Sequence, residues 1–181
     1  FYRLNTAHPQ LKDKRVRQAL TYALDRKAIV EKVSKGGELA AVAFTPPKTG
    51  LYTPKNYLTY DLEKAKKLLA AAGYPNGKGF KGFEILYNNQ ELHRTIAEAI
   101  QQMWKINLGI NVTLRNQEWK VYLDTVNKKD YDVARAAWVG DYPDPNSFLD
   151  LWVTDGGNNN TSWSNKKYDS LIKEANSTGD Q

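Results

Sequence analysis

The sequence predicts an α/β fold, in which a mixed, mostly parallel sheet is flanked by helices. Residues 83–115 have the pattern of a strand, a helix of about 15 residues and a second strand. A crossover of that kind joins two parallel strands with right-handed sense. Residues 131–138 form a further apolar segment, and several other segments carry apolar residues at the i, i+3, i+4, i+7 spacing of amphipathic helices.

Composition limits the possible functions. The chain has 181 residues, of which 41% are hydrophobic and 25% charged, as in a soluble globular domain. It has no cysteine and only two histidines, which excludes thiolate metal sites and disulfides and makes a histidine metal centre improbable. No segment approaches the roughly 20 apolar residues of a membrane span, and the first ten residues lack the features of a signal peptide.

The net charge of +6 raises the possibility of nucleic-acid binding. However, the lysines fall mostly as pairs beside acidic residues, and no basic run exceeds two. Because only clustered charge makes a track for phosphates, a solvated surface is the better interpretation. We expect no nucleic-acid partner, no cofactor and no metal.

In the first half of the chain, residues 1–5 are expected to form a strand. Asp13 should cap a helix that runs to residue 24, and Asp25 should open a shorter helix that Gly36-Gly37 stops. The proline-containing segment 36–56 is predicted to follow an extended path over the surface, since prolines at this density preclude a helix. Asp61 should then cap a helix that ends at Gly73.

In the second half, strands are predicted at 83–87 and 110–115, with a helix at 92–106 between them. The helix should bury Ile96, Ala99, Ile100 and Met103. We then expect a helix at 118–128 that turns Trp119, Tyr122, Leu123 and Val126 inward or towards a groove. After this helix we expect the strand at 131–138, a short helix after Pro145 and a last helix at 165–175. The last helix should turn Tyr168, Leu171, Ile172 and Ala175 inward.

The segment YDVARAAWVGDYPDP, residues 131–145, is the strongest candidate for a binding site. It places Arg135, Trp138, Asp141 and Tyr142 around the carboxyl end of a predicted strand, where open α/β sheets usually bind ligands. A charge within an apolar strand is costly unless something pairs with it. The alternative is that Arg135 and Asp141 pair with other side chains and the prolines only stiffen a turn; residue types alone do not decide between the two.

Two further polar residues, Asn88 and His93, follow the carboxyl end of the strand at 83–87. They lie on the same predicted ligand side of the sheet. A histidine in the first turn of a helix is more often a simple surface residue, so without other information the surface interpretation of His93 is favoured.

Several stretches together resemble the extracytoplasmic oligopeptide-binding proteins of bacterial ABC importers. These stretches are RVRQALTYALDR at 15–26, TPP at 45–47, KKLLAAAGY at 66–74, LYNNQELH at 86–93, NVTLRNQEW at 111–119 and DVARAAWVGDYPDP at 132–145. The resemblance implies a lobe with the type II periplasmic-binding-protein fold. It also implies that residues 1–181 form only the carboxyl-side lobe of a two-lobed protein, without the amino-terminal lobe and the final carboxyl-terminal segment.

The same resemblance implies residue roles. Asp141 matches the aspartate that receives the α-amino group of a bound peptide, and Arg135 and His93 match residues that reach its carboxylate. Trp119 and Trp138 match aromatic residues that line side-chain pockets.

Asn88 and Tyr142 fall in the same cleft-facing loops. The prolines of GDYPDP depart from the better-known Gram-negative binders, which leaves peptide length and pocket shape open.

The implied function is capture of short peptides and their delivery to an ABC transporter permease. The protein would be a monomer, either periplasmic or held on the outer face of a Gram-positive membrane by a lipid anchor outside this chain. Alternatives within the family are a binder of dipeptides, a murein tripeptide, a peptide pheromone or a nickel complex. An enzyme is disfavoured, because the chain has no nucleophile motif, although Asp141 and Asp144 could in principle serve a carboxylate-dependent hydrolase.

Overall fold

The computed structural model describes residues 1–178, whose strands form one sheet in the order β1-β4-β2-β3. The strands are β1 (Tyr2–Leu4), β2 (Phe83–Asn88), β3 (Val112–Gln117) and β4 (Val133–Arg135). β2 pairs in parallel with β3 and with β4, and β1 pairs antiparallel with β4. The predicted mixed, mostly parallel sheet is therefore confirmed. Because β1 is antiparallel, its first residues lie at the edge where the other strands end.

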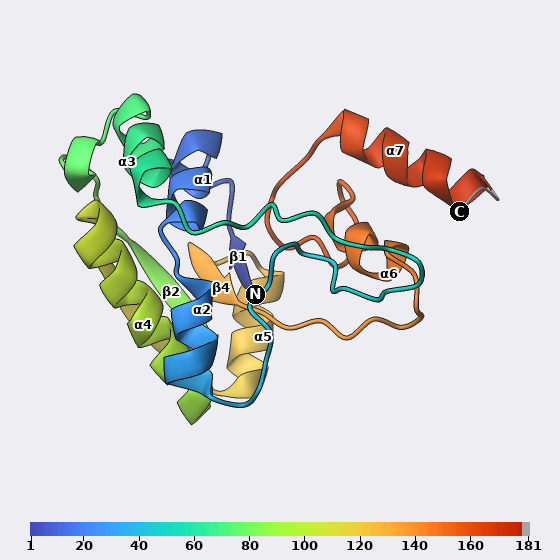
Figure 1. The fold of residues 1–181 in the computed structure, drawn as a ribbon, viewed down its shortest axis with the longest axis horizontal. Helices are drawn as coiled ribbons and strands as arrows, with labels where there is room; N and C mark the ends of the chain where they lie inside the picture. The colour runs from blue at the N-terminus through green and yellow to red at the C-terminus, as the bar shows by residue number, and fades with distance from the viewer. Residues whose placement is uncertain (179–181) are drawn as a thin grey trace.

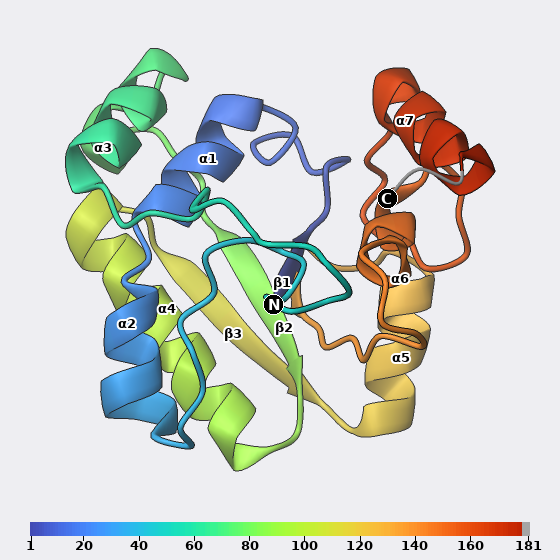
Figure 2. The same cartoon turned by 45° about the vertical axis from the view of Figure 1, so that its right-hand side comes forward.

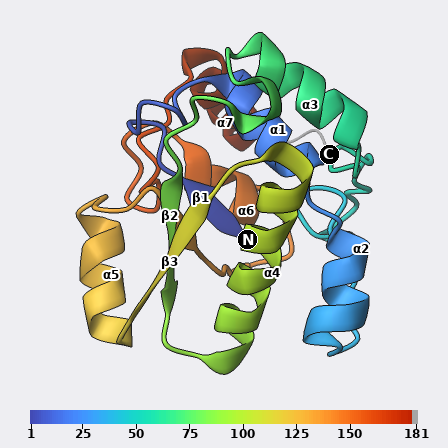
Figure 3. The ribbon, with the colours of Figure 1, turned by 90° about the vertical axis from the view of Figure 1, so that its left-hand side faces the viewer.

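Helices cover both faces of the sheet (Figure 3). On one face α4 (Glu91–Leu108), α1 (Lys14–Tyr22) and α3 (Leu62–Ala71) enclose the larger core, which includes Ile85 and Val133 of the sheet. On the other face α5 (Trp119–Asn127) packs on Leu86 and Ala134 through Tyr122 and Val126. Successive side chains of β2 and β4 thus pack into the cores on opposite faces of the sheet, because side chains alternate between the two faces along a strand.

The predicted helix starts are confirmed where a carboxylate caps the first turn. The Asp13 side chain accepts a hydrogen bond from the Arg15 backbone N–H, and that of Asp61 accepts one from the Lys64 N–H. α4 ends at Gly109, whose φ of 69° suits glycine; an added Cβ would lie 2.3 Å from the carbonyl oxygen of Asn76. None of the helices among residues 1–178 is both long enough and apolar enough to cross a lipid bilayer.

A second part of the chain lies beside the sheet and contains α6 (Asn146–Leu149), the 3-10 helix η3 (Asp150–Trp152) and α7 (Lys166–Ser177). The connection between the π-helix η1 (Ile29–Ser34) and α3 crosses from the α1 side towards α6 (Figures 1 and 2). Phe44 of this connection packs edge-on against Phe1 and Trp152, with ring centroids 5.1 and 4.9 Å apart. At Gly50 the connection passes so close to the loop at Pro143 that an added Cβ would lie 2.9 Å from the proline carbonyl oxygen.

Two predictions about elements were wrong in part. The strand predicted at 131–138 is only Val133–Arg135, because β1 pairs with these three residues alone and β2 with Val133 and Ala134. The second helix is one short α-turn, α2 (Arg26–Ala28), that continues as a π-helix, η1 (Ile29–Ser34), and its apolar residues are half-buried. A further 3-10 turn, η2 (Pro75–Gly77), precedes β2.

The buried face of α4 also differs from the prediction. Its buried residues are His93, Ala97, Ile100, Trp104 and Leu108, so that of the predicted set only Ile100 is fully buried. Trp104 can be enclosed because its indole N–H donates to the Leu20 carbonyl oxygen at 2.9 Å.

The predicted inward faces of the helices at 118–128 and 165–175 hold only in part. Tyr122, Val126 and Ile172 are buried, whereas Trp119, Leu123, Leu171 and Ala175 are exposed.

Candidate functional site

The carboxyl edge of the sheet gathers polar residues from four strands. Asn88 ends β2, Gln117 ends β3 and Arg135 ends β4, while Tyr2 at the start of β1 lies opposite Arg135. Asn88 and Gln117 are themselves register partners. The topology therefore brings residues from positions 2 to 135 of the sequence to one edge, as expected for the ligand side of such a sheet.

Arg135 is half-buried and carries an unpaired charge. Its guanidinium forms no ion pair or hydrogen bond within residues 1–178. Burial lowers the pKa of Arg135, and the nearby hydroxyls of Tyr122 and Tyr2 partly offset this effect. The Tyr122 hydroxyl donates to the backbone carbonyl of Arg135, which fixes the end of β4. The alternative was that Arg135 forms a structural ion pair. No such pair exists among the described residues.

His93 is buried, with 8% of its surface exposed, so the surface interpretation of this residue was wrong. Its Nδ1 atom is enclosed and has no hydrogen-bond partner within the part of the chain that the structure describes. Burial, followed by the positive charge of Arg135, lowers the pKa of His93. The side-chain oxygen of Asn88 is likewise enclosed without a partner. Asn88, His93 and Arg135 thus form one polar cluster whose hydrogen-bonding groups are incompletely used.

The segment after β4 carries the other predicted residues and is held by α6. The Trp138 indole N–H donates to the Ser147 carbonyl oxygen at 2.7 Å, and the Ser147 hydroxyl accepts from the Asp141 backbone N–H at 2.8 Å. The Tyr142 hydroxyl accepts from the Asn146 amide at 3.0 Å. Gly140 lies against Phe148, whose ring atoms would be 2.9 Å from an added Cβ. This loop is therefore positioned by side-chain contacts.

The carboxylate of Asp141 is exposed and forms no ion pair or hydrogen bond among residues 1–178. Its neighbour Asp144 differs, because its Oδ1 accepts from the Asn146 backbone N–H at 2.8 Å and so stabilises the turn. Asp141 is thus a free anion on an ordered loop, whereas Asp144 has a structural role.

Between the cation at Arg135 and the anion at Asp141 lies a segment without regular secondary structure whose peptide groups are free. The last ladder bond runs from the Ala136 N–H to the Phe1 carbonyl oxygen at 2.7 Å. No backbone hydrogen bond is made by Ala137 to Gly140 with any described residue, and Val139 is 85% exposed. Backbone N–H and C=O groups without partners can pair with an added peptide strand.

Trp119 is half-exposed and its ring stacks on Tyr122, with centroids 5.6 Å apart and planes 16° from parallel. No aromatic contact joins Trp119 to Trp138 within the described residues. The two tryptophans therefore stand on separate elements, and Trp119 is connected to the Arg135 cluster through Tyr122.

Sequence reasoning missed three polar residues at this edge: Tyr2, Arg3 and Gln117. The Tyr2 hydroxyl, Arg3 Nε and Gln117 Oε1 are all enclosed without a partner in the described part of the chain. The sequence did contain a signal for Arg3, because it is a lone charge within a short predicted strand, as Arg135 is.

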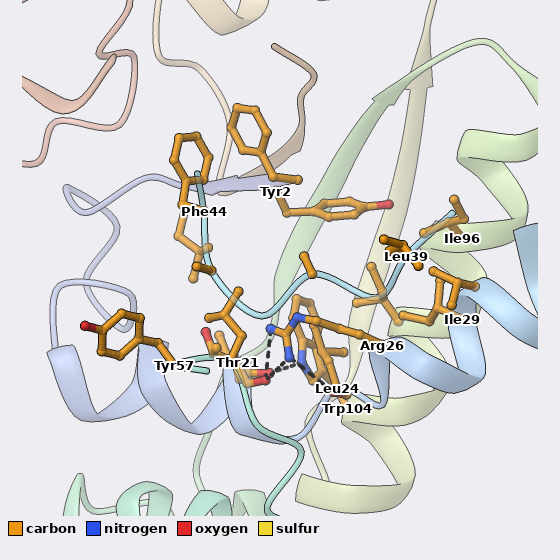
Figure 4. Close-up of a pocket in the computed structure, with 18 residues that line it drawn as sticks. Tyr2, Thr21, Leu24, Arg26, Ile29, Leu39, Phe44, Tyr57, Ile96 and Trp104 are labelled. Atoms are coloured by element: carbon orange, nitrogen blue, oxygen red, sulfur yellow. Dashed lines mark hydrogen bonds between the residues drawn. The ribbon is translucent and has the colours of Figure 1, made fainter. Parts of the chain in front are cut away.

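An apolar cavity of about 600 Å³ lies between α1, η1, α4 and the crossing connection (Figure 4). Tyr2, Ile29, Phe44 and Trp104 contribute to its lining, and none of the seven predicted site residues does. Its one charged side chain, Arg26, donates to the carbonyl oxygens of Thr21 and Leu24 at 3.3 Å and so caps the end of α1. The cavity therefore has apolar shape but no free charge to define a ligand.

Comparisons with known proteins agree with this geometry. The family model described as bacterial extracellular solute-binding proteins, family 5 Middle, matches residues 1–160. The chain is 43% identical over 180 residues to the periplasmic oligopeptide-binding protein OppA of Salmonella typhimurium, covering 96% of this chain and 33% of that protein. It is 41% identical over 181 residues to the periplasmic murein peptide-binding protein MppA of Escherichia coli, covering 97% and 34%.

Solved structures give the same result. A periplasmic oligopeptide-binding protein from Borrelia burgdorferi superposes with a TM-score of 0.92 at 40% identity, over 99% of this chain and 36% of that one. The unliganded open form of MppA superposes with a TM-score of 0.91 at 38% identity, over 99% and 36%. These similarities confirm the predicted type II binding-protein fold, and the chain spans about a third of the length of these relatives. The chain belongs to family 5 of the bacterial extracellular solute-binding proteins.

Proposed function

We propose that the protein containing this chain captures short peptides outside the cytoplasm and delivers them to the permease of an ABC transporter. One observation carries the proposal: an unpaired cation at Arg135 and an unpaired anion at Asp141 flank a segment whose peptide groups are free. A zwitterionic peptide supplies the complementary carboxylate, ammonium and backbone groups. The printed names of several relatives, which describe oligopeptide-binding and murein peptide-binding proteins, support it.

Each site residue has a role in this proposal. Asp141 receives the α-amino group of the peptide, and Arg135 with His93 receives its carboxylate through charge-assisted hydrogen bonds. Asn88 offers its free amide oxygen to the peptide, and Tyr142 borders the amino-terminal end.

Trp119 and Trp138 form walls of side-chain pockets. Both project from different elements, so the pockets between them are wide, and water can fill what a small side chain leaves empty. Binding of varied sequences follows from such pockets.

We also propose that residues 1–181 form one lobe of a two-lobed receptor, since the chain spans only about a third of its relatives. Closure of the second lobe over the ligand would signal occupancy to the permease. The receptor would act as a monomer in the periplasm or on the outer face of the membrane, there through a lipid anchor outside this chain. We propose no catalytic role, because Asp144, the possible second carboxylate beside Asp141, stabilises a turn.

The test is calorimetric titration of tri-alanine into the full-length protein, with the free peptide compared with its N-acetylated and its C-amidated forms. We expect each cap to weaken binding by about tenfold or more, the effect of losing a charge-assisted bond. The acetylation effect should vanish in Asp141→Asn and persist in Asp144→Asn, which changes the same loop. Equal binding of all three peptide forms would overturn the assignment of the two ends.

If the full-length protein binds no free peptide, the ligand class must be reopened to the other ligands of the family: murein peptides, pheromones and metal complexes. Peptides should also be recovered intact after incubation. Cleavage would instead favour a hydrolase.

A further inference from the structure

Arg3 is a buried cation without a partner. Only 9% of its surface is exposed, and its side chain forms no ion pair or hydrogen bond with residues 1–178. Its Nε is the guanidinium nitrogen that is enclosed without a partner. The nearest compensation is the Phe1 ring, whose centroid lies 5.8 Å from the guanidinium carbon.

Such an arrangement is unfavourable in the ligand-free protein. A buried charge is normally paired, and a buried donor without an acceptor calls for an explanation. The contact with the Phe1 ring stabilises the cation but leaves the N–H groups of the guanidinium without acceptors. An anion that reaches Arg3 would satisfy both the charge and the donors.

The register of β1 places Arg3 beside the proposed peptide site but on the other face of the sheet. Tyr2 lies opposite Arg135 and faces the α4 side, whereas Arg3 lies opposite Ala134 and faces α5. On this face Ala134 forms a cluster with Tyr122 and Tyr131. The positive charge of Arg3 partly offsets the rise that burial causes in the pKa of both phenols.

Tyr122 connects Arg3 to the site. Its hydroxyl donates to the Arg135 carbonyl, and its ring stacks on Trp119, a proposed pocket wall. Burial raises the pKa of Tyr122, and the positive charges of Arg3 and of Arg135 each partly offset that rise, so both cations act on this phenol. Arg3 therefore lies on the same face of the sheet as Tyr122, the residue on which Trp119 stacks.

We propose that Arg3 selects peptides with an acidic side chain, whose carboxylate it binds in the pocket bordered by Trp119 and Tyr122. This inference rests on the proposed function. A guanidinium presents a planar fork of donors that matches a carboxylate with two parallel hydrogen bonds. Successive side chains of an extended peptide point to opposite sides. A peptide that crosses the end of β1 can thus offer its terminal carboxylate to Arg135 and a side-chain carboxylate to Arg3.

The experiment uses the full-length protein and tetra-alanine peptides in which glutamate is placed at each of the first three positions in turn. Each is compared by calorimetry with the peptide that carries glutamine there, which has the same shape without the charge. At one position, we expect the peptide with glutamate to bind about tenfold more tightly than the peptide with glutamine, because a hydrogen bond between charged groups is stronger than one to a neutral amide. Arg3→Met should abolish this preference, so that the glutamate and glutamine peptides bind with equal affinity.

Two further variants sharpen the test. Arg3→Lys keeps the charge without the fork, so it should retain only part of the preference and remains informative if Arg3→Met fails to fold. Arg15→Met removes an exposed arginine that pairs with Asp13 at 2.6 Å, and it should leave the preference intact.

The outcomes separate this inference from the proposed function. Tight binding of tetra-alanine with no difference between glutamate and glutamine at any position overturns the inference and leaves the peptide receptor standing. A preference that survives in both Arg3 variants also overturns it, since another group must then bind the acid. If no peptide binds at all, the proposed function fails, and the inference fails with it.

Discussion

Replacement of Arg135 by methionine should make the ligand-free protein more stable and weaken its binding of short peptides. Arg135 is half-buried at the end of β4 and pairs with no carboxylate among residues 1–178. Burial of this charge therefore costs desolvation free energy, and no ion pair compensates for it. The lowered pKa of Arg135 agrees with this cost. Methionine keeps most of the apolar stem, so the substitution removes a cost without creating a large cavity.

The expected gain is about 1 kcal/mol, the lower end of the range for replacing a buried charge by an apolar side chain, because Arg135 is only partly enclosed. For a unit of this size, that free energy corresponds to an increase in Tm of about 2–4 °C. Differential scanning calorimetry of the ligand-free protein measures it. In contrast, the affinity for tri-alanine should fall by more than about 2 kcal/mol, roughly 30-fold, because the peptide carboxylate loses its partner.

Arg94→Met is the matched control. Arg94 is exposed on α4 one residue from His93 and pairs with Glu91 at 2.5 Å and with Glu98 at 4.0 Å. Its loss should leave Tm unchanged or slightly lower, since exposed helix pairs contribute little. A lower Tm in Arg135→Met would refute the reasoning, because it would mean that Arg135 has a stabilising partner. A higher Tm with unchanged peptide affinity would remove Arg135 from the site.

Three other substitutions test separate parts of the structure. Asp141→Asn should weaken tri-alanine binding by more than about 2 kcal/mol with no change in Tm, since its carboxylate is exposed and unpaired; unchanged calorimetric affinity would contradict its assignment. Burial lowers the pKa of His93 below its ordinary 6.5, so its contribution to stability is present above pH 6.5 and is lost as the pH falls from 6.5 through the lowered pKa of the folded protein. Below pH 6.5, the Tm of His93→Gln should fall less with decreasing pH than the Tm of the wild type. The same dependence of Tm on pH in both proteins would count against burial of a neutral imidazole. Trp104→Phe leaves the Leu20 carbonyl without its donor and should cost about 1–3 kcal/mol in thermal unfolding, with peptide affinity unchanged; a cost under about 0.5 kcal/mol would argue against that bond.

The parts of the fold that depend on local periodicity were predictable. The β2-α4-β3 unit, its parallel pairing and the carboxylate caps at Asp13 and Asp61 follow from patterns within about 30 residues. The buried face of α4 was not predicted, because ranking residues by apolarity omits His93 and Trp104. Both side chains are buried through contacts that lie far away in the sequence, such as the bond from Trp104 to Leu20 across 84 positions.

The candidate site was predictable in part for the same reason. Topology alone indicates the carboxyl ends of β2 and β4, and thereby Asn88, His93 and Arg135. The contribution of β1 depends on its antiparallel pairing with β4, in which Tyr2 meets Arg135 at a separation of 133 positions. No local pattern encodes a pairing of that range, and so Tyr2 and Arg3 became visible only in the structure.

The distribution of unsatisfied polar atoms is the strongest reason to place the ligand at this edge. Five of the eight enclosed side-chain atoms without a partner among residues 1–178 belong to residues at the carboxyl edge of the sheet, namely Tyr2, Arg3, Asn88, His93 and Gln117, and the other three belong to His8, Arg115 and Asn146. Near the other end of α4, by contrast, the Gln101 amide donates to the Val112 carbonyl at 2.8 Å and the Asn107 amide to the Ala23 carbonyl at 3.0 Å. An enclosed polar group that has no partner within the protein is tolerated where a ligand supplies the partner. A ligand rich in amide, ammonium and carboxylate groups meets that requirement, and one that only fills the apolar cavity beside Trp104 does not.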